Sequence, residues 1–259
     1  MSGAGKVILV GAGPGAPDLI TVRGADALRC ADAVVYDALA AKSLLDLAPP
    51  EALRIDVGKR GHDEPTRTQE ETTSLLLRLA AQGLTVVRLK GGDPYVFGRG
   101  GEEAQALLDA GVPFEVVPGV TSAVAAPAAA GVPVTHRGVA AAFTVVTGHR
   151  RRGEPDVDWR SLARVGGTVV VLMGVAQRGT IAAELIAGGL DPATPVAAVR
   201  SATTPDEVIG RTRLDELAAM PIEAPAVIVI GAVAVMRLRE NRQFAPFDSL
   251  GRRNVSGSA

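Results

Sequence analysis

Aromatic side chains are scarce in this sequence. Phe, Trp and Tyr make up 3% of the 259 residues, although hydrophobic residues as a whole make up 47%. A sizeable core is therefore available, but it must be built mostly from Ala, Val and Leu. A chain of this length is enough for one large domain or two modest ones.

Cysteine is nearly absent, since Cys30 stands alone in the chain. A single cysteine forms neither an internal disulfide nor a cysteine-based metal cluster, so we expect a protein of the reducing cytoplasm. Cys30 falls in a helical pattern, where we expect a small core residue. His62, His136 and His149 lack the spacing of metal ligands, and we expect no metal.

The sequence has neither a strong charge of one sign nor a long apolar run. Its net charge is −1, which argues against a general nucleic-acid-binding protein. The apolar run from Ala224 to Met236 is interrupted by Pro225 and Gly231 and is too short to span a bilayer. The first residues carry no signal-peptide pattern. We therefore expect neither nucleic acid nor a membrane as a partner.

Short β-branched runs alternate with helical patterns in the first part of the chain. The predicted strands cover residues 6–10, 33–36, 53–57, 85–89 and 114–117. Helices are predicted over residues 19–30, 68–81 and 102–109, and an alanine-rich one begins at Ser122. Thr68 and Glu71 have the spacing of a capping box. This alternation predicts an α/β domain with a mostly parallel sheet covered on both faces.

A second domain is indicated by a change of composition near residues 131–137. Strands are predicted there over residues 143–147, 168–172, 196–200, 207–212 and 226–230, and a helix over 180–187. Periodicity is lost from about residue 241. We expect an N-terminal α/β domain over residues 1–130, a C-terminal α/β domain over 131–245, and a flexible tail over 246–259.

The first glycine-rich turn invites a dinucleotide-binding interpretation. Gly11 to Gly15 follow a strand, and Asp37 ends the next one. However, the glycines are spaced G-x-G-x-G, and Pro14 lacks the backbone N–H that a pyrophosphate would need. A nicotinamide or flavin site is therefore disfavoured.

The most informative stretch runs from Val86 to Glu103. A buried strand breaks there into Gly91, Gly92, Asp93 and Pro94, more glycines follow, and a helix begins near Glu102. Open α/β sheets bind ligands where a strand ends in such a loop. A tight connection between a strand and a helix, without a ligand, is the alternative reading of the loop itself.

This stretch resembles the signature loop of the tetrapyrrole methylases. Shorter pieces of the sequence follow the order of the same family, at Gly11–Gly15, Val34–Asp37, Gly58-Lys59-Arg60, Val116–Ser122, Val132–Arg137, Thr147–His149 and Met173-Gly174. The likeness covers about residues 6–239. Gly58-Lys59-Arg60, together with the long loop, points to the branch that acts on uroporphyrinogen III rather than to diphthine synthases or ribosomal-RNA methylases.

The resemblance implies two α/β domains with mostly parallel or mixed five-stranded sheets, an active-site cleft between them, and a homodimer. It also implies that S-adenosylmethionine binds as co-substrate, with S-adenosylhomocysteine as product. The contacts would fall on Pro14, Gly91, Gly92, Asp93, Val96, Thr121, Ser122, Met173 and Ala202. Ala202 stands where the family has a glycine that uses its backbone.

The reaction implied by the resemblance is methylation of uroporphyrinogen III at C2 and then C7. The product would be precorrin-2, on the way to sirohaem or cobalamin. In the family, an aspartate at the position of Asp37 accepts a proton and a lysine at the position of Lys59 donates one. A structural ion pair is the alternative for these two residues, which both lie at the ends of predicted strands.

A tetrapyrrole substrate with eight carboxylates calls for cationic side chains. The candidates are Arg60, Arg88, Arg99 and Arg137; Arg88 lies inside a strand, where a structural ion pair is the alternative. Two other functions also stay open, a methylase of a later corrin precursor and a non-catalytic nucleotide-binding relative.

Overall fold

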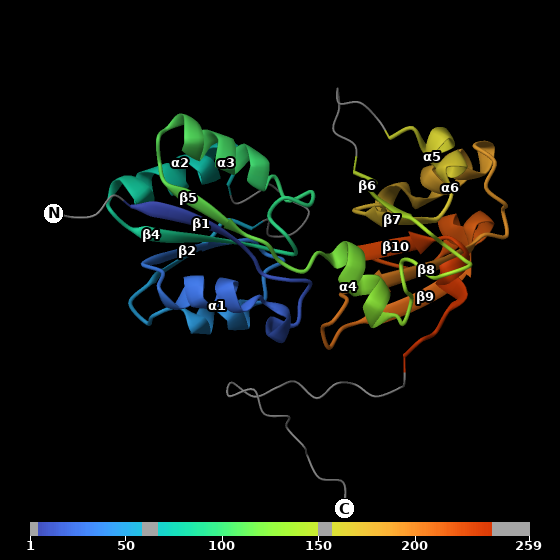
Figure 1. Ribbon diagram of the computed structural model, residues 1–259, viewed down its shortest axis with the longest axis horizontal. Coiled ribbons are helices and arrows are strands. Elements are labelled where there is room, and N and C mark those ends of the chain that lie inside the picture. Colours follow the sequence, from blue (N-terminus) through green and yellow to red (C-terminus); the bar gives the residue numbers. More distant parts are fainter. Residues whose placement is uncertain (1–4, 59–66, 150–156, 240–259) are drawn as a thin grey trace, which may run out of the picture. The chain divides into compact units, whose positions relative to one another are not determined.

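The computed structural model of the chain describes residues 5–58, 67–149 and 157–239. The chain divides into two compact units (Figure 1). The first contains the chain up to Ala125 together with Ser201–Glu207, and the second contains Ala126–Arg200 and the chain from Val208 onward. The return of Ser201–Glu207 to the first unit was not predicted. The domain limits at residues 130 and 245 and the expected cleft stay predictions, and the expected tail lies outside the described residues.

The sheet of the first unit is entirely parallel. It consists of β1 (Lys6–Gly11), β2 (Ala33–Tyr36), β3 (Leu53–Asp56), β4 (Thr85–Lys90) and β5 (Phe114–Val117), in the order β3-β2-β4-β1-β5. All five strands therefore end at the same edge of the sheet, which brings the loops that follow them together.

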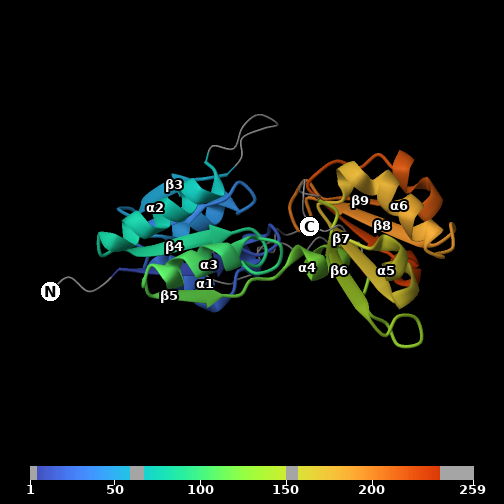
Figure 2. The ribbon, with the colours of Figure 1, turned by 90° about the horizontal axis from the view of Figure 1, so that it is seen from above.

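Helices cover both faces of this sheet, as the alternation predicts. The helix α1 (Val22–Arg29) and the 3-10 helix η2 (Lys42–Leu47) pack on one face against Val34, Val87 and Leu89. The helices α2 (Gln69–Ala81) and α3 (Gly100–Asp109) pack on the other face against Val35 and Val86. Figure 2 looks onto this second face. Because side chains alternate along β4, Arg88 and Lys90 belong to the face that α2 and α3 cover.

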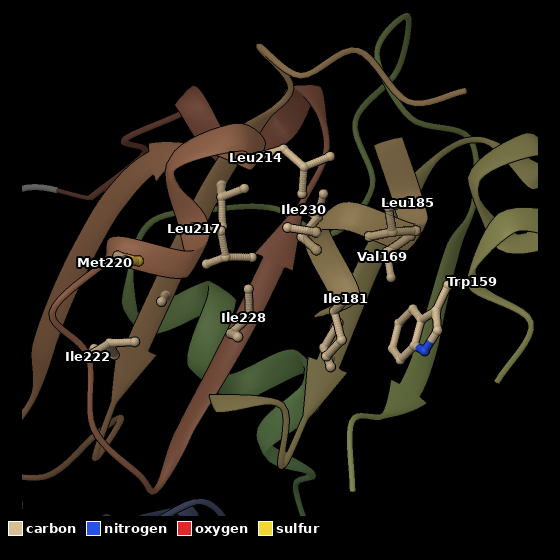
Figure 3. Close-up of a cluster of buried hydrophobic side chains, with 14 of the residues drawn as sticks. Trp159, Val169, Ile181, Leu185, Leu214, Leu217, Met220, Ile222, Ile228 and Ile230 are labelled. Carbon is tan, nitrogen blue, oxygen red and sulfur yellow. The ribbon is translucent and has the colours of Figure 1, made fainter. Parts of the chain in front are cut away.

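The sheet of the second unit is mixed. Its strands are β6 (Phe143–Thr147), β7 (Thr168–Leu172), β8 (Pro195–Arg200), β9 (Val208–Arg213) and β10 (Ala226–Ile230), in the order β6-β7-β10-β8-β9. Strands β6 and β7 pair in parallel, whereas the β7–β10, β10–β8 and β8–β9 pairs are antiparallel. The core lies between this sheet and α5 (Trp159–Val165), α6 (Arg178–Ala187) and η4 (Leu214–Ala219) (Figure 3). It contains one aromatic ring, that of Trp159, among mostly branched aliphatic side chains.

The predicted elements agree closely with those of the structure, and the fold class is confirmed. The capping box is present, since Thr68 Oγ1 accepts the Glu71 backbone N–H at 3.1 Å and Glu71 Oε2 accepts that of Thr68 at 2.7 Å. The remaining elements are α4 (Ser122–Ala129), η1 (Pro17–Leu19), η3 (Val175–Gln177) and η5 (Ala232–Val235). The sequence reasoning missed α5 and the 3-10 helices, because these elements are too short for a clear periodicity.

Cys30 corrects one expectation. It is exposed and caps the C-terminus of α1 rather than lying in the core. The helix ends one residue earlier, at Arg29, so the apolar face formed by Gly24, Ala25 and Leu28 does not extend to it. In the part of the chain that the structure describes, no helix is long and apolar enough to cross a membrane.

Candidate functional site

The loops after β1 and β4 stay together beyond the edge of the first sheet. Ala12 donates its N–H to the Lys90 carbonyl at 2.7 Å. Gly13 and Gly92 then exchange two backbone hydrogen bonds, with N–O distances of 3.2 Å and 2.7 Å. The glycine turn at residues 11–15 and the loop that begins at Gly91 therefore form one wall of backbone.

The loop after β5 closes onto this wall without room for a side chain. A β-carbon built on Gly119 would lie 2.2 Å from the Gly92 carbonyl oxygen and 2.6 Å from the Gly11 Cα. Gly92 itself has a φ of +66°, in the left-handed region that favours glycine. The site is thus lined by backbone from three loops, which suits a ligand that is held mostly by N–H and C=O groups.

Asp93 joins two of these loops through its side chain. Its Oδ1 accepts the Tyr95 N–H at 2.8 Å, and its Oδ2 accepts the Gly119 N–H at 3.0 Å. Both carboxylate oxygens therefore have a structural partner. The predicted role of Asp93 in cofactor binding is untested.

The structure gathers most of the predicted cofactor residues in the first unit. These are Pro14, Gly91, Gly92, Asp93, Val96, Thr121, Ser122 and Ala202, whereas Met173 follows β7 in the second unit. Ala202 comes to the glycine turn because Ala16 donates its N–H to Thr203 Oγ1 at 3.0 Å. Sequence reasoning missed Thr203, since nothing in a single sequence pairs residues this far apart.

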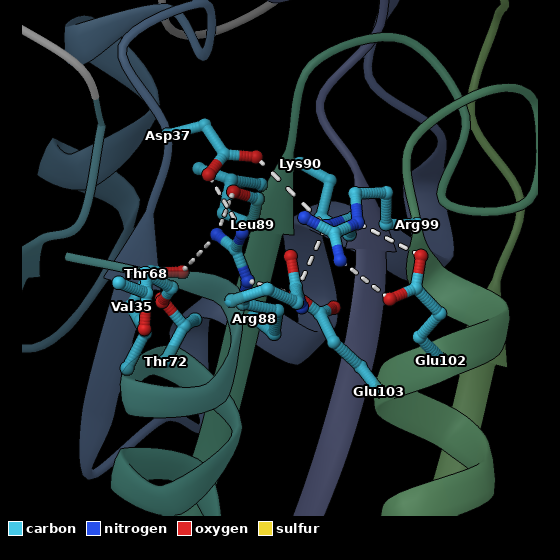
Figure 4. A network of polar contacts seen from close by, with 11 residues as sticks. Val35, Asp37, Thr68, Thr72, Arg88, Leu89, Lys90, Arg99, Glu102 and Glu103 are labelled. Atoms are coloured by element: carbon cyan, nitrogen blue, oxygen red, sulfur yellow. Dashed lines mark hydrogen bonds and ion pairs between the residues drawn. The ribbon is translucent and has the colours of Figure 1, made fainter. Parts of the chain in front are cut away.

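Four charged side chains lie at the ends of β2 and β4 and on α3; we call Asp37, Arg88, Lys90 and Glu103 the buried charge network (Figure 4). Glu103 Oε1 accepts hydrogen bonds from Arg88 Nε and Lys90 Nζ, both at 3.1 Å. Asp37 Oδ1 accepts one from an Arg88 terminal nitrogen at 2.6 Å. The side chains of Arg88, Lys90 and Glu103 are 4%, 3% and 0% exposed, and that of Asp37 is 30% exposed.

Burial and pairing act against each other in this network. Burial lowers the pKa of Arg88, but Glu103 and Asp37 outweigh burial and raise that pKa above its usual value. Burial, together with the charge of Arg88, lowers the pKa of Lys90 despite the attraction of both carboxylates. Burial would raise the pKa of Glu103, but Arg88 and Lys90 hold it below its usual value. The network therefore stabilises Glu103 as an anion between two cations.

Sequence reasoning found Asp37 and Arg88 but missed Lys90 and Glu103. A signal was available, because Arg88 and Lys90 stand two positions apart in a buried strand and so point to the same face. Two cations on one buried face require a buried anion nearby. Arg88 forms ion pairs with Asp37 and Glu103, as its structural alternative expects, and its predicted contact with substrate is untested.

The other predicted cations are distributed differently. Arg99 begins α3 and forms a bidentate ion pair with Glu102, at 2.8 Å and 2.6 Å. Arg137 is exposed in the second unit. Lys59 and Arg60 lie outside the described residues, so neither their predicted roles nor the alternative of a Lys59–Asp37 ion pair is tested. Within the described ranges, no cluster of three or more His, Cys, Asp or Glu side chains could hold a metal ion.

Comparisons with known proteins give consistent results. The family described as Tetrapyrrole (Corrin/Porphyrin) Methylases matches residues 6–218. A Uroporphyrinogen-III C-methyltransferase of Synechocystis sp. is 47% identical over 248 residues, covering 93% of this chain and 94% of the relative. The crystal structure of a Uroporphyrin-III C-methyl transferase from Thermus thermophilus complexed with S-adenyl homocysteine matches with a TM-score of 0.78 and 46% identity, over 89% of this chain and 99% of that one. A cobalt precorrin-4 methyltransferase also has a TM-score of 0.78, at 32% identity, over 88% of this chain and 95% of that one.

Proposed function

Because the chain belongs to the tetrapyrrole (corrin/porphyrin) methylase family, we propose that it methylates uroporphyrinogen III at C2 and C7 with S-adenosylmethionine, giving precorrin-2. The observation that carries this proposal is the likeness to a uroporphyrinogen methyltransferase along nearly the whole of both chains. The relative crystallised with S-adenyl homocysteine supports the cofactor. Methylation of a later corrin precursor is the second candidate, which the lower identity to the cobalt precorrin-4 enzyme disfavours.

The glycine loops of the first unit fit S-adenosylmethionine. Around Gly92, a β-carbon would meet nothing closer than the Ser122 nitrogen and the Thr121 Cα, both at 3.8 Å. Backbone groups of Gly91, Gly92, Thr121 and Ser122 would hold the ligand there, with Pro14 and Ala202 alongside. When bound, S-adenosylmethionine supplies a methyl group that its sulfonium centre already activates.

The residues of the chain then have two tasks in this proposal. One is alignment, because a methyl transfer between two bound molecules gains most of its rate from correct orientation. The other is removal of a proton, because transfer of a methyl group as a cation leaves the macrocycle positively charged. We assign the proton acceptor to Asp37, whose carboxylate is partly exposed at the end of β2. Lys59 is the proposed proton donor.

Carboxylates of the macrocycle would be bound by arginines that can exchange partners. The side chains of Arg99 and Glu102 are 35% and 55% exposed, so a substrate carboxylate can reach Arg99 and replace Glu102 as its partner. Arg137 and Arg60 are the further candidates. Arg88 fits this task poorly, since its guanidinium is buried and already paired.

The proposal also includes a homodimer in the cytoplasm. Its support is the family resemblance and the single cysteine of the chain. Light scattering on the purified protein, coupled to size-exclusion chromatography, would measure the mass in solution. A mass of one chain across a range of concentrations would contradict the dimer.

The deciding experiment is an anaerobic incubation with enzymatically generated uroporphyrinogen III and S-adenosylmethionine, read by mass spectrometry. We expect a macrocycle that has gained two methyl groups. Asp37→Asn should abolish most of this product, whereas the control Asp46→Asn, at an exposed position in η2, should not. Cofactor binding without any methylated product would contradict the substrate and favour a later corrin precursor.

A further inference from the structure

Arg88 is closed to substrate on every side that the structure describes. Its Nε donates to Glu103, and one terminal nitrogen donates to the backbone carbonyls of Val35 and Leu89, at 3.4 Å and 3.3 Å. Its other terminal nitrogen donates to Asp37. A substrate carboxylate would have to displace these buried partners. These contacts indicate that Arg88 holds other groups of the protein rather than the substrate. Among those groups, Asp37 has the partly exposed side chain.

Stability alone does not explain four charges at this place. The attraction within a buried ion pair is largely offset by the loss of hydration, so such pairs contribute little compared with apolar side chains. What a buried network does provide is a fixed geometry, because each member restrains the next. Of the four members, Asp37 is the one with a substantially exposed side chain.

The two carboxylate oxygens of Asp37 are in different situations. Oδ1 accepts the 2.6 Å hydrogen bond from Arg88. Oδ2 lies 4.0 Å from Lys90 Nζ, and it accepts no hydrogen bond from the described residues. One oxygen is thus anchored to the interior, while the lone pairs of the other remain available.

We propose that Glu103 and Arg88 are positioning residues for Asp37. Glu103 fixes the guanidinium of Arg88, and Arg88 fixes Oδ1 of Asp37, which leaves Oδ2 directed to the proton that leaves the macrocycle. Lys90 completes the array by holding Glu103 and adding positive charge near Oδ2. This inference rests on the proposed function, since it takes Asp37 as the proton acceptor.

The proton transfer balances in charge and atoms. A carbon of the macrocycle forms a bond to the methyl group with its own π electrons, and the sulfur keeps the electron pair of the broken S–C bond. The positively charged macrocycle then loses a proton from carbon. The electrons of that C–H bond return to the macrocycle, and a new O–H bond forms at Asp37 Oδ2.

A double-mutant cycle between Glu103 and Asp37 tests this positioning role. Glu103→Gln keeps the shape of the side chain but removes the charge that holds Arg88. We expect kcat to fall roughly 10- to 100-fold, because misplacing a reacting group by about 1 Å costs this much. The KM for uroporphyrinogen III and the affinity for S-adenosylhomocysteine should stay unchanged. In the Asp37→Asn background, Glu103→Gln should cause no further loss of kcat.

The outcomes separate this inference from the proposed function. Equal losses from Glu103→Gln in both backgrounds would indicate a merely structural role and overturn the positioning. Wild-type kcat in Glu103→Gln would overturn it as well. Full activity in Asp37→Asn would overturn both the proton acceptor and the inference, whereas a wild-type protein that does not methylate uroporphyrinogen III would overturn the proposed substrate.

Two further variants guard against a loss caused by misfolding. Arg88→Lys keeps the positive charge but loses the planar fork, and it should reproduce the fall in kcat if Glu103→Gln does not fold. Asp109→Asn changes an exposed carboxylate on the same helix α3 and should leave kcat unchanged. Wild-type kcat in Arg88→Lys would contradict the proposal.

Discussion

Gly119→Ala is the substitution that most directly tests the backbone-lined site. The new β-carbon would lie 2.2 Å from the Gly92 carbonyl oxygen, and both Gly11 Cα and the Gly11 carbonyl carbon would lie within 2.8 Å. All three atoms belong to backbone, so no side chain can rotate away. Relief requires the loops to separate by about 1 Å, which is the kind of overpacking that costs about 1–3 kcal/mol of stability.

The same movement should weaken cofactor binding, because Gly92 lies in both the clash and the proposed site. We expect the affinity for S-adenosylhomocysteine to fall about 10- to 100-fold, which corresponds to roughly 1.4–2.7 kcal/mol. Titration calorimetry gives the affinity, and urea unfolding gives the stability. The matched control is Gly101→Ala on α3, where a β-carbon would meet nothing within 4 Å.

Gly119→Ala and Gly101→Ala should differ in both cofactor affinity and stability. Gly101→Ala should bind the cofactor normally, and it should be as stable as the wild type or more stable by up to about 1 kcal/mol, since Ala favours the helix over Gly. Normal affinity in Gly119→Ala together with lowered stability would refute the assignment of the cofactor to these loops. Normal affinity together with normal stability would refute the close approach of the loops itself.

Three further predictions concern other parts of the first unit. Arg99→Ala should raise the KM for uroporphyrinogen III about tenfold or more without changing cofactor affinity, because hydrogen bonds between charged groups contribute roughly 1.5–3 kcal/mol; an unchanged KM in steady-state kinetics would remove Arg99 from the substrate site. Thr68→Ala should lower the free energy of unfolding by about 1 kcal/mol, because it removes the N-cap of α2; an unchanged midpoint in urea unfolding would contradict this. Because the folded pKa of Glu103 is below its ordinary value of 4.5, the unfolded chain takes up the proton first as the pH falls, and stability is lost as the pH falls below that value toward the folded pKa. Glu103→Gln should therefore show a shallower loss of stability in acid, and an equal slope in pH-dependent unfolding would contradict this.

Local patterns were enough to find the elements of the fold. The strand over Ala33–Tyr36 and the capped helix that begins after Thr68 depend on neighbours a few residues apart, so the sequence shows them directly. Elements of fewer than about two helical turns, such as α5, do not repeat a pattern often enough to be recognised. Cys30 was misjudged for a related reason, since the end of a helix is set within one or two residues by its cap.

Some residues of the candidate site were likewise visible in the sequence, and others were not. Glycines, Asp93 and Asp37 stand out in the sequence because they interrupt apolar strands, and the family resemblance gave them roles. Glu103 did not stand out, since a glutamate in the first turn of a helix is normally an exposed residue at the positive end of the dipole. Its burial follows from the parallel sheet, which places α3 over the two cations of β4.

By itself, the amino-acid sequence determined the order of strands and helices, the glycine loops and the family, because these depend on short-range stereochemistry and on motifs read along the chain. Only the tertiary structure decided that Ser201–Glu207 returns to the first unit, that Gly119 and Gly92 touch, and that Arg88 is committed to Asp37 and Glu103. Each of these contacts joins segments that are distant in the sequence. Such contacts depend on how the strands pair in the sheet and how the helices pack on it, which no local sequence pattern encodes.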